Sequence, residues 1–302
     1  MSLRRQKTYA LFAFALVLLF TLPAQGQQNG HYLQSATGLM NGSLPPPGYY
    51  LGVVQFEYFV DSIKGPNGGS IPAHLTISAP IALMSAVTKT KFLGADYGFS
   101  FLVPIMNQRF TTNVLPSRTF GAYGVSDIFF TPVQLGWHKS KADVLFAYTL
   151  AAPTGDYSSD QVFNTGLGMW SNMFQLGATY YPDKFKKWNA SVLSTWEIDT
   201  TKARTNIKPG AQMNLEYGLG RRMFNYKLNV GVAGSYYRKL TLDSGTAIAF
   251  YDQENSVGPE VSLAIPAAHF SFDVRYEPQF AVRGRTGGQF LFISLSYLGI
   301  QH

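Results

Sequence analysis

Residues 270–280 read Phe-Ser-Phe-Asp-Val-Arg-Tyr-Glu-Pro-Gln-Phe, and this stretch decides the fold. Every even position is apolar, and every odd position between them is polar or charged. Successive side chains of a β-strand point to opposite faces, whereas on a helix the same residues would surround the cylinder. The stretch is therefore predicted to be a strand with one apolar and one charged face. The open question is whether the apolar face meets a protein core or lipid.

The same alternation recurs along the whole chain. About twelve strands are expected, near 49–60, 78–88, 92–105, 127–137, 143–152, 169–181, 188–198, 210–219, 226–237, 256–265, 269–280 and 289–298. Short turns alternate with longer polar connections, which are predicted near 61–77, 106–126, 153–168, 199–209, 238–255 and 281–288. This alternation is typical of outer-membrane barrels, which have short turns at one end and long loops at the other.

The tryptophans favour lipid over a protein core. Trp137, Trp170, Trp188 and Trp196 all fall at or near predicted strand ends, where outer-membrane barrels carry aromatic girdles. The predicted fold class is all-β: a transmembrane antiparallel up-and-down β-barrel of about twelve strands. A soluble β-sandwich is the alternative, but it would need Greek-key connections of irregular length.

The N-terminus has the pattern of a secretory signal peptide. Arg4, Arg5 and Lys7 precede an apolar run over 9–22, and Ala24-Gln25-Gly26 supplies the small residues that signal peptidase reads. A single membrane anchor is the alternative, although the run is short for a span. The expected organisation is a signal peptide at 1–26, a periplasmic N-terminal segment at 27–46, an outer-membrane barrel at 47–298 and a C-terminal tail at 299–302. The expected location is the outer membrane of a Gram-negative cell, after cleavage near Gly26.

Composition narrows the function further. Loss of Arg4, Arg5 and Lys7 lowers the net charge from +7 to +4, so the basic balance does not indicate a nucleic-acid partner. The chain has no cysteine, which excludes disulfides, thiolate metal sites and a cysteine nucleophile. The histidines show no catalytic or metal-ligand spacing, so we expect no enzyme activity, no cofactor and no metal.

If the apolar faces meet lipid, the opposite faces line the interior. There the first strand is expected to add a partly apolar wall, which would suit an aromatic or hydrophobic solute, and small inward residues suggest an open passage. The predicted lumen-lining residues are Leu51, Val53, Gln55, Glu57, Phe59, Asp96, Glu197, Glu216, Glu260, Asp273, Arg275 and Glu277.

Several short blocks resemble one family when they are taken in order. They are Gly30-His31-Tyr32, Leu-Pro-Pro-Pro-Gly-Tyr-Tyr at 44–50, Leu-Gly-Ala-Asp-Tyr-Gly at 93–98, Leu-Gly-Trp-His at 135–138, Ala-Pro-Thr-Gly at 152–155, Gly-Ala-Thr-Tyr-Tyr at 177–181, Glu-Tyr-Gly at 216–218 and Gly-Pro-Glu at 258–260. Together they resemble the family of the MetA pathway of phenol degradation, with its SphA-like outer-membrane proteins. The resemblance implies a barrel that aids uptake near aromatic-compound catabolism. One departure is the last residue, His302, because such barrels usually end on an aromatic residue.

The expected function is a channel for passive or facilitated uptake of small molecules, such as aromatic or hydrophobic compounds. One alternative is a non-conducting structural or surface-binding barrel, plugged by residues 27–46 or by the loop near 106–126. A surface hydrolase is a third. Expected partners are outer-membrane lipid and lipopolysaccharide, a small-molecule solute, and the barrel assembly machinery during biogenesis.

Overall fold

The computed structural model describes residues 29–111 and 119–299, and it consists almost entirely of antiparallel strands. The predicted signal peptide and the last three residues lie outside this part of the chain. The strands are β1 (Gly48–Lys64), β2 (Ser70–Phe92), β3 (Ala95–Thr111), β4 (Thr119–Val125), β5 (Ile128–His138), β6 (Ala142–Ala152), β7 (Ser171–Tyr180), β8 (Trp188–Asp199), β9 (Gln212–Met223), β10 (Leu228–Lys239), β11 (Gln253–Ile265), β12 (Phe270–Arg283) and β13 (Thr286–Leu298). A 3₁₀ turn, Pro266–Ala268, precedes β12.

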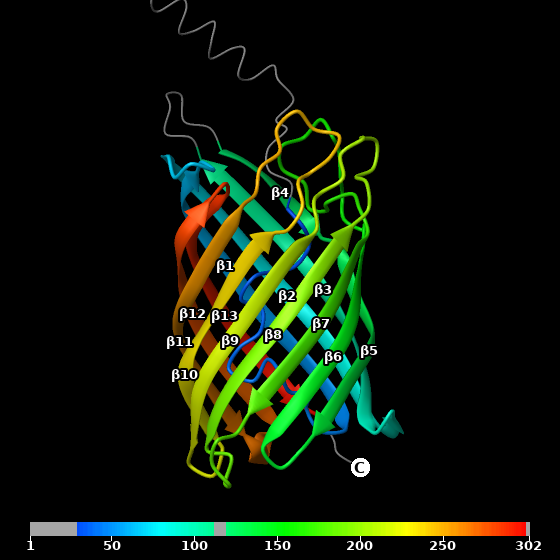
Figure 1. Ribbon diagram of the computed structural model, residues 1–302, viewed down its shortest axis with the longest axis vertical. Coiled ribbons are helices and arrows are strands. Elements are labelled where there is room, and N and C mark those ends of the chain that lie inside the picture. Colours follow the sequence, from blue (N-terminus) through cyan, green and yellow to red (C-terminus); the bar gives the residue numbers. More distant parts are fainter. Residues whose placement is uncertain (1–28, 112–118, 300–302) are drawn as a thin grey trace, which may run out of the picture.

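The strands close into a barrel (Figure 1) because β1 pairs with β13 as well as with β2. Each strand otherwise pairs with its neighbour in sequence, as in an up-and-down meander. Strands β4 and β5 both pair with β3, β4 along its second half and β5 along its first half. Together they occupy a single strand position of the barrel. The barrel thus has twelve strand positions, and the predicted fold class is confirmed.

Strand β12 shows which face of the barrel wall is outer and which is inner. Phe272 and Tyr276 of β12 are exposed on the outer surface, whereas Arg275 and Glu277 are buried in the interior. Other large apolar side chains exposed along the strands include Val192, Leu219, Val232, Leu263 and Leu295. The outer face is therefore apolar along the strands, as a barrel in lipid requires. No helix of the described residues is long and apolar enough to cross a membrane.

The connections differ between the two ends of the barrel, but less regularly than expected. One end, called the short-turn end, carries short turns, the start of β1 and the end of β13 (Figure 1, bottom). The other, the long-loop end, carries the loops 153–170, 200–211 and 240–252. The long connections predicted near 61–77 and 281–288 are wrong, since both stretches are mostly strand and form tight hairpins. The stretch 106–126 is largely a β3–β4 hairpin, with residues 112–118 outside the described part.

Two local features show how the sequence adapts to closure. Pro132 lies in β5 where the β5–β6 register shifts between Phe130 and Val133, so a bulge accommodates the missing ladder donor. In the β7–β8 turn, the carboxylate of Asp183 accepts backbone N–H groups from Trp188, Lys187 and Phe185. These donors favour the ionised form and hold the pKa of Asp183 below its ordinary value.

Candidate functional site

The interior of the barrel is occupied by its own chain. Residues 29–46, called the lumen segment, run from the long-loop end to the short-turn end before β1 begins (Figure 1, dark blue). His31 lies beside Ser171 at the start of β7, and Ser43 donates to Asp143 near the start of β6. The expected periplasmic position of 27–46 is therefore corrected for its described part. The segment carries no ionisable side chain apart from His31 and the Tyr32 phenol, and it is rich in Gly, Ser and Pro, so its backbone is free to bond to the wall.

Three glutamates on the inner wall bind the backbone of the lumen segment. Glu197 accepts the N–H groups of residues 31 and 32 at 2.5 and 3.1 Å. Glu216 accepts those of residues 36 and 37 at 3.2 and 2.9 Å, and the Tyr32 hydroxyl at 2.9 Å. Glu260 accepts that of Leu39 at 3.1 Å. An intramolecular hydrogen bond typically contributes about 0.5–1.5 kcal/mol. The inward carboxylates therefore hold the segment in place.

Arg275 balances part of this negative charge at the centre of the lumen. Its guanidinium lies 3.3 Å from Glu260 and 3.0 Å from Glu277, and it donates to the carbonyl of Ser35. Glu277 in turn accepts the Ser35 hydroxyl at 2.7 Å. Arg275 also stacks over the ring of Phe292 at 4.5 Å. This buried network connects β11, β12 and β13 to the middle of the segment.

Close backbone contact explains the small inward residues. A Cβ atom at Gly42 would lie 2.1 Å from the carbonyl carbon of Ala178, and one at Gly218 would lie 2.8 Å from the Cα atom of Leu39. Neither backbone can yield by that much, so both positions require glycine. At these two positions the missing side chains make room for the lumen segment and do not leave an open passage.

The opposite wall of the lumen is apolar. Its buried members lie on β1, β2 and β13, and Leu33 of the lumen segment packs against them. They are Phe56, Tyr58, Val60, Ala79, Ile81, Phe290 and Phe292. One side of the segment thus meets carboxylates, and Leu33 on the other meets aromatic and aliphatic side chains.

The structure corrects the predicted lining of β1. Leu51, Val53 and Phe59 are 54%, 53% and 40% exposed on the outer surface. Gln55 and Glu57 share their parity and also face outward, where they bond to each other and to Ser78. Burial fixes this assignment, since Phe56 and its β13 partner Phe292 are only 3% and 4% exposed. An apolar inner wall exists, but residues of the other parity form it.

The remaining predicted lining residues do face inward. Glu197, Glu216, Glu260, Arg275 and Glu277 are buried and meet the lumen segment. Asp273 faces inward and accepts the Ser294 hydroxyl at 2.9 Å. Asp96 is buried at the short-turn end, beside Lys91 and 3.6 Å from His138.

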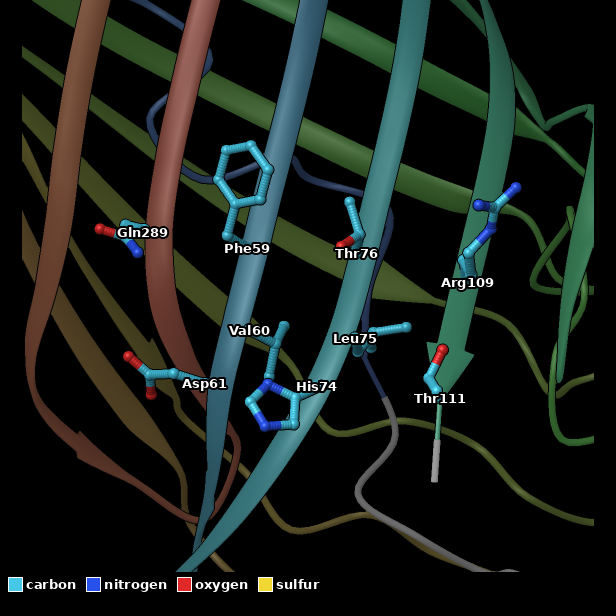
Figure 2. A pocket seen from close by; sticks show the side chains of 9 residues that line it. All are labelled: Phe59, Val60, Asp61, His74, Leu75, Thr76, Arg109, Thr111 and Gln289. Carbon is cyan, nitrogen blue, oxygen red and sulfur yellow. The ribbon is translucent and has the colours of Figure 1, made fainter. Parts of the chain in front are cut away.

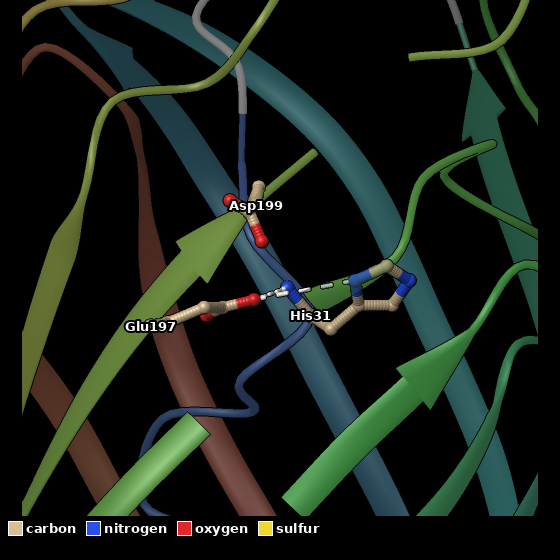
Figure 3. A group of neighbouring side chains, drawn as sticks. All are labelled: His31, Glu197 and Asp199. Atoms are coloured by element: carbon tan, nitrogen blue, oxygen red, sulfur yellow. Dashed lines mark hydrogen bonds and ion pairs between the residues drawn. The ribbon is translucent and has the colours of Figure 1, made fainter. Parts of the chain in front are cut away.

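Sequence reasoning missed a cluster around His31 at the long-loop end. Its Nε2 atom lies 2.7 Å from Asp127 and its Nδ1 atom 2.6 Å from the Ser171 hydroxyl. Figure 3 shows Glu197 and Asp199, from the end of β8, beside the imidazole. These residues are 96 to 168 positions from His31, so no local spacing reveals them. Only the pairing of distant strands brings them together.

A serine, a histidine and an aspartate in this order have the form of a nucleophilic relay. However, Ser171 is fully buried, and its hydroxyl also contacts the carboxylate of Asp199. A negative charge at that position opposes the formation of an alkoxide on the serine. The cluster is thus built to hold the lumen segment and not to attack a substrate.

A shallow hollow also lies outside the lumen, over β1, β2 and β3 toward the long-loop end (Figure 2). Its volume is about 320 Å³, and Asp61, His74 and Arg109 are its charged or titratable members. These side chains lie on the same outward face of the sheet as Phe59 and Thr76, which pair with each other; Thr76 also pairs with Arg109. The hollow therefore belongs to the outer surface and does not connect with the segment.

The fold is shared with a solved outer-membrane channel. The COG4313 outer membrane channel from Pseudomonas putida F1 superposes with a TM-score of 0.72 at 12% identity, covering 87% of this chain and 99% of that one. The beta domain of the Bordetella autotransporter BrkA gives 0.47 at 9% identity, over 83% and 99%. A Pseudomonas aeruginosa FadL homologue gives 0.42 at 10% identity, over 82% and 89%.

No curated protein matches the chain in sequence. A family model does match, over residues 60–295. This range includes every strand in full except β1, of which it covers only the last residues, and β13, whose last residues it leaves out. With this match and the shared barrel of an outer-membrane channel, the chain belongs to the family described as "Putative MetA-pathway of phenol degradation".

Proposed function

We propose that this barrel is a channel for the passive or facilitated uptake of small molecules, including aromatic or hydrophobic compounds. The observation that carries the proposal is the two-sided lumen, which has a carboxylate wall that binds the lumen segment and an apolar wall against which Leu33 packs. The family description, which names phenol degradation, supports an aromatic solute. A solute of that kind would compete with Leu33 for Phe56, Phe290 and Phe292.

Such a channel would lie in the outer membrane with a defined orientation. The short-turn end would face the periplasm and the long-loop end the exterior of a Gram-negative cell, after cleavage of the leader near Gly26. Outer-membrane lipid would cover the apolar face, with lipopolysaccharide around the long-loop end. The barrel assembly machinery would insert the chain.

One observation favours a second candidate, a barrel that does not conduct. The lumen segment is bonded to the wall from His31 to Ser43, so a rigidly seated segment would block every solute. Glu216→Ala removes one of its main anchors and separates the two candidates.

Permeation of two cations of equal charge tests the proposal in planar bilayers. Phenyltrimethylammonium and tetramethylammonium are compared with the wild type, with Glu216→Ala and with Phe56→Ser. We expect the aromatic cation to be preferred despite its size, and this preference to fall in Phe56→Ser. Permeation in order of size alone would contradict an aromatic solute. Absence of current in Glu216→Ala as well would support the non-conducting barrel.

A further inference from the structure

The cluster at the long-loop end has the donors of a metal site, and the two structural parts that supply them are separate. His31 comes from the lumen segment, whereas Glu197 and Asp199 come from β8. One ligand atom from each lies within 4.8 Å of the others. In a tetrahedral site with bonds of about 2.1 Å the donors stand about 3.4 Å apart, so small side-chain rotations would suffice.

The hydrogen bonds of Asp127 determine which nitrogen of His31 is available. This carboxylate accepts the N–H groups of Gly155 and Leu167 at 2.8 and 2.7 Å, in addition to His31 Nε2. Because an ionised carboxylate only accepts, Nε2 must carry a proton. A carboxylate that holds one imidazole nitrogen in this way orients the other for a metal ion. His31 Nδ1 is that nitrogen, and it faces Glu197 at 4.0 Å.

The centre of the cluster has one hydrogen-bond donor fewer than its acceptors need. The Ser171 hydroxyl lies next to both His31 Nδ1 and Asp199, and its single proton can serve only one of them. That proton therefore leaves either His31 Nδ1 or the Asp199 oxygen that it faces without a donor from Ser171.

We propose that His31, Glu197 and Asp199 bind a divalent transition-metal ion, with Zn²⁺ as the best match, which fastens the lumen segment to the barrel wall. An imidazole with two carboxylates suits Zn²⁺, whereas Ca²⁺ takes six to eight oxygen ligands. The ion would take the place of the missing donor between Nδ1 and the two carboxylates. Ser171 or water would complete the coordination.

The consequence of such a site is linkage between metal and segment. Only the seated segment presents His31 to β8, so the ion binds the seated form preferentially. Free metal at a hundred times its dissociation constant would then shift the equilibrium about 100-fold toward that form. The inference concerns binding and does not depend on whether the barrel conducts.

Calorimetric titration of the untagged, chelator-treated full-length mature protein with Zn²⁺ tests the site. We expect one ion per chain in the wild type, at least tenfold weaker binding in His31→Ala and in Glu197→Gln, and little response to Ca²⁺. The matched control is His74→Ala, which removes an exposed histidine from the outer surface and should bind like the wild type. No Zn²⁺ binding by the wild type, or equal affinity in His31→Ala, would overturn the proposal.

Hydrogen exchange of residues 30–43 gives a second readout that a merely structural histidine would not change. In the wild type, Zn²⁺ should slow exchange across the segment, and the chelator should reverse the effect. In His31→Ala the metal should have no effect, while unchanged exchange in β8 and β9 would show that the barrel is intact. Equal exchange of the wild-type segment with and without Zn²⁺ would contradict a metal ion that fastens the segment to the wall.

Discussion

Glu216 is the anchor whose loss should free the lumen segment most clearly. Its carboxylate accepts the hydroxyl groups of Tyr32 and Thr37 and the backbone N–H groups of residues 36 and 37. Glu216→Ala leaves two N–H groups without an acceptor, at about 1–3 kcal/mol each. The seated form would thus lose about 2–6 kcal/mol, or about 30-fold to about 20,000-fold in population. Because residue 36 is exposed to the lumen and water can reach it, we expect the lower end.

Thiol labelling measures that change directly, because the chain contains no cysteine. Ser35 is only 1% exposed, so Ser35→Cys should react with an impermeant maleimide only when the segment leaves its seat. Adding Glu216→Ala should raise the labelling rate at least tenfold. Asp273→Ala is the matched control, since this inward carboxylate bonds to Ser294 on the wall. An unchanged rate with Glu216→Ala, or an equal rise with Asp273→Ala, would refute the reasoning.

Three further predictions concern other parts of the barrel. Gly42→Ala places a Cβ atom 2.1 Å from a carbonyl carbon of β7, which should push the lumen segment off the wall. Single-channel recordings should then show more frequent openings than in Gly69→Ala, whose Cβ atom meets open space. Equal opening frequencies would contradict this. Val232→Arg puts a charge on the lipid face of β10 and should cost about 2–4 kcal/mol in urea unfolding from lipid vesicles, whereas a cost near zero would mean that this face does not meet hydrocarbon. The pKa of Asp183 is lowered by the backbone N–H groups that donate to its carboxylate, chiefly that of Trp188. Its ionised form therefore stabilises the turn fully above the ordinary Asp pKa of about 3.9. This stabilisation is lost as the pH falls through the lower pKa of the folded state. Hydrogen exchange of the turn should show protection that disappears only in acid, and equal protection at pH 2 and pH 6 would be inconsistent with this role.

Periodicity predicted the strands well because a period of two is a property of each strand alone. In β12 apolar and polar residues alternate strictly, so the faces of Phe272 and Arg275 could be assigned before any partner was known. In β1 both parities carry large apolar residues, and the expectation followed the polar pair Gln55 and Glu57 to the wrong side. The burial of Phe56 and of its β13 partner Phe292 shows which parity faces inward.

The lumen segment could not be placed by the same reasoning. Its contacts join residues more than a hundred positions apart, such as Tyr32 with Glu216 and Ser35 with Glu277. An uncharged stretch rich in glycine, serine and proline has no period, so its sequence resembles that of an exposed leader. The glutamates were predicted to line the lumen, but their ligand, the backbone of the same chain, leaves no signal in local sequence.

In the proposed channel, the lumen segment closes the passage and must move for solutes to pass. Ser35 and Ser235 have their hydroxyl oxygens 3.0 Å apart, so Ser35→Cys with Ser235→Cys should form a reversible disulfide between segment and wall in a chain without other cysteines. Bilayer currents from the same channels are then recorded before and after reduction. We expect no openings while the disulfide is intact and openings after reduction. Equal currents in the two states would contradict this expectation.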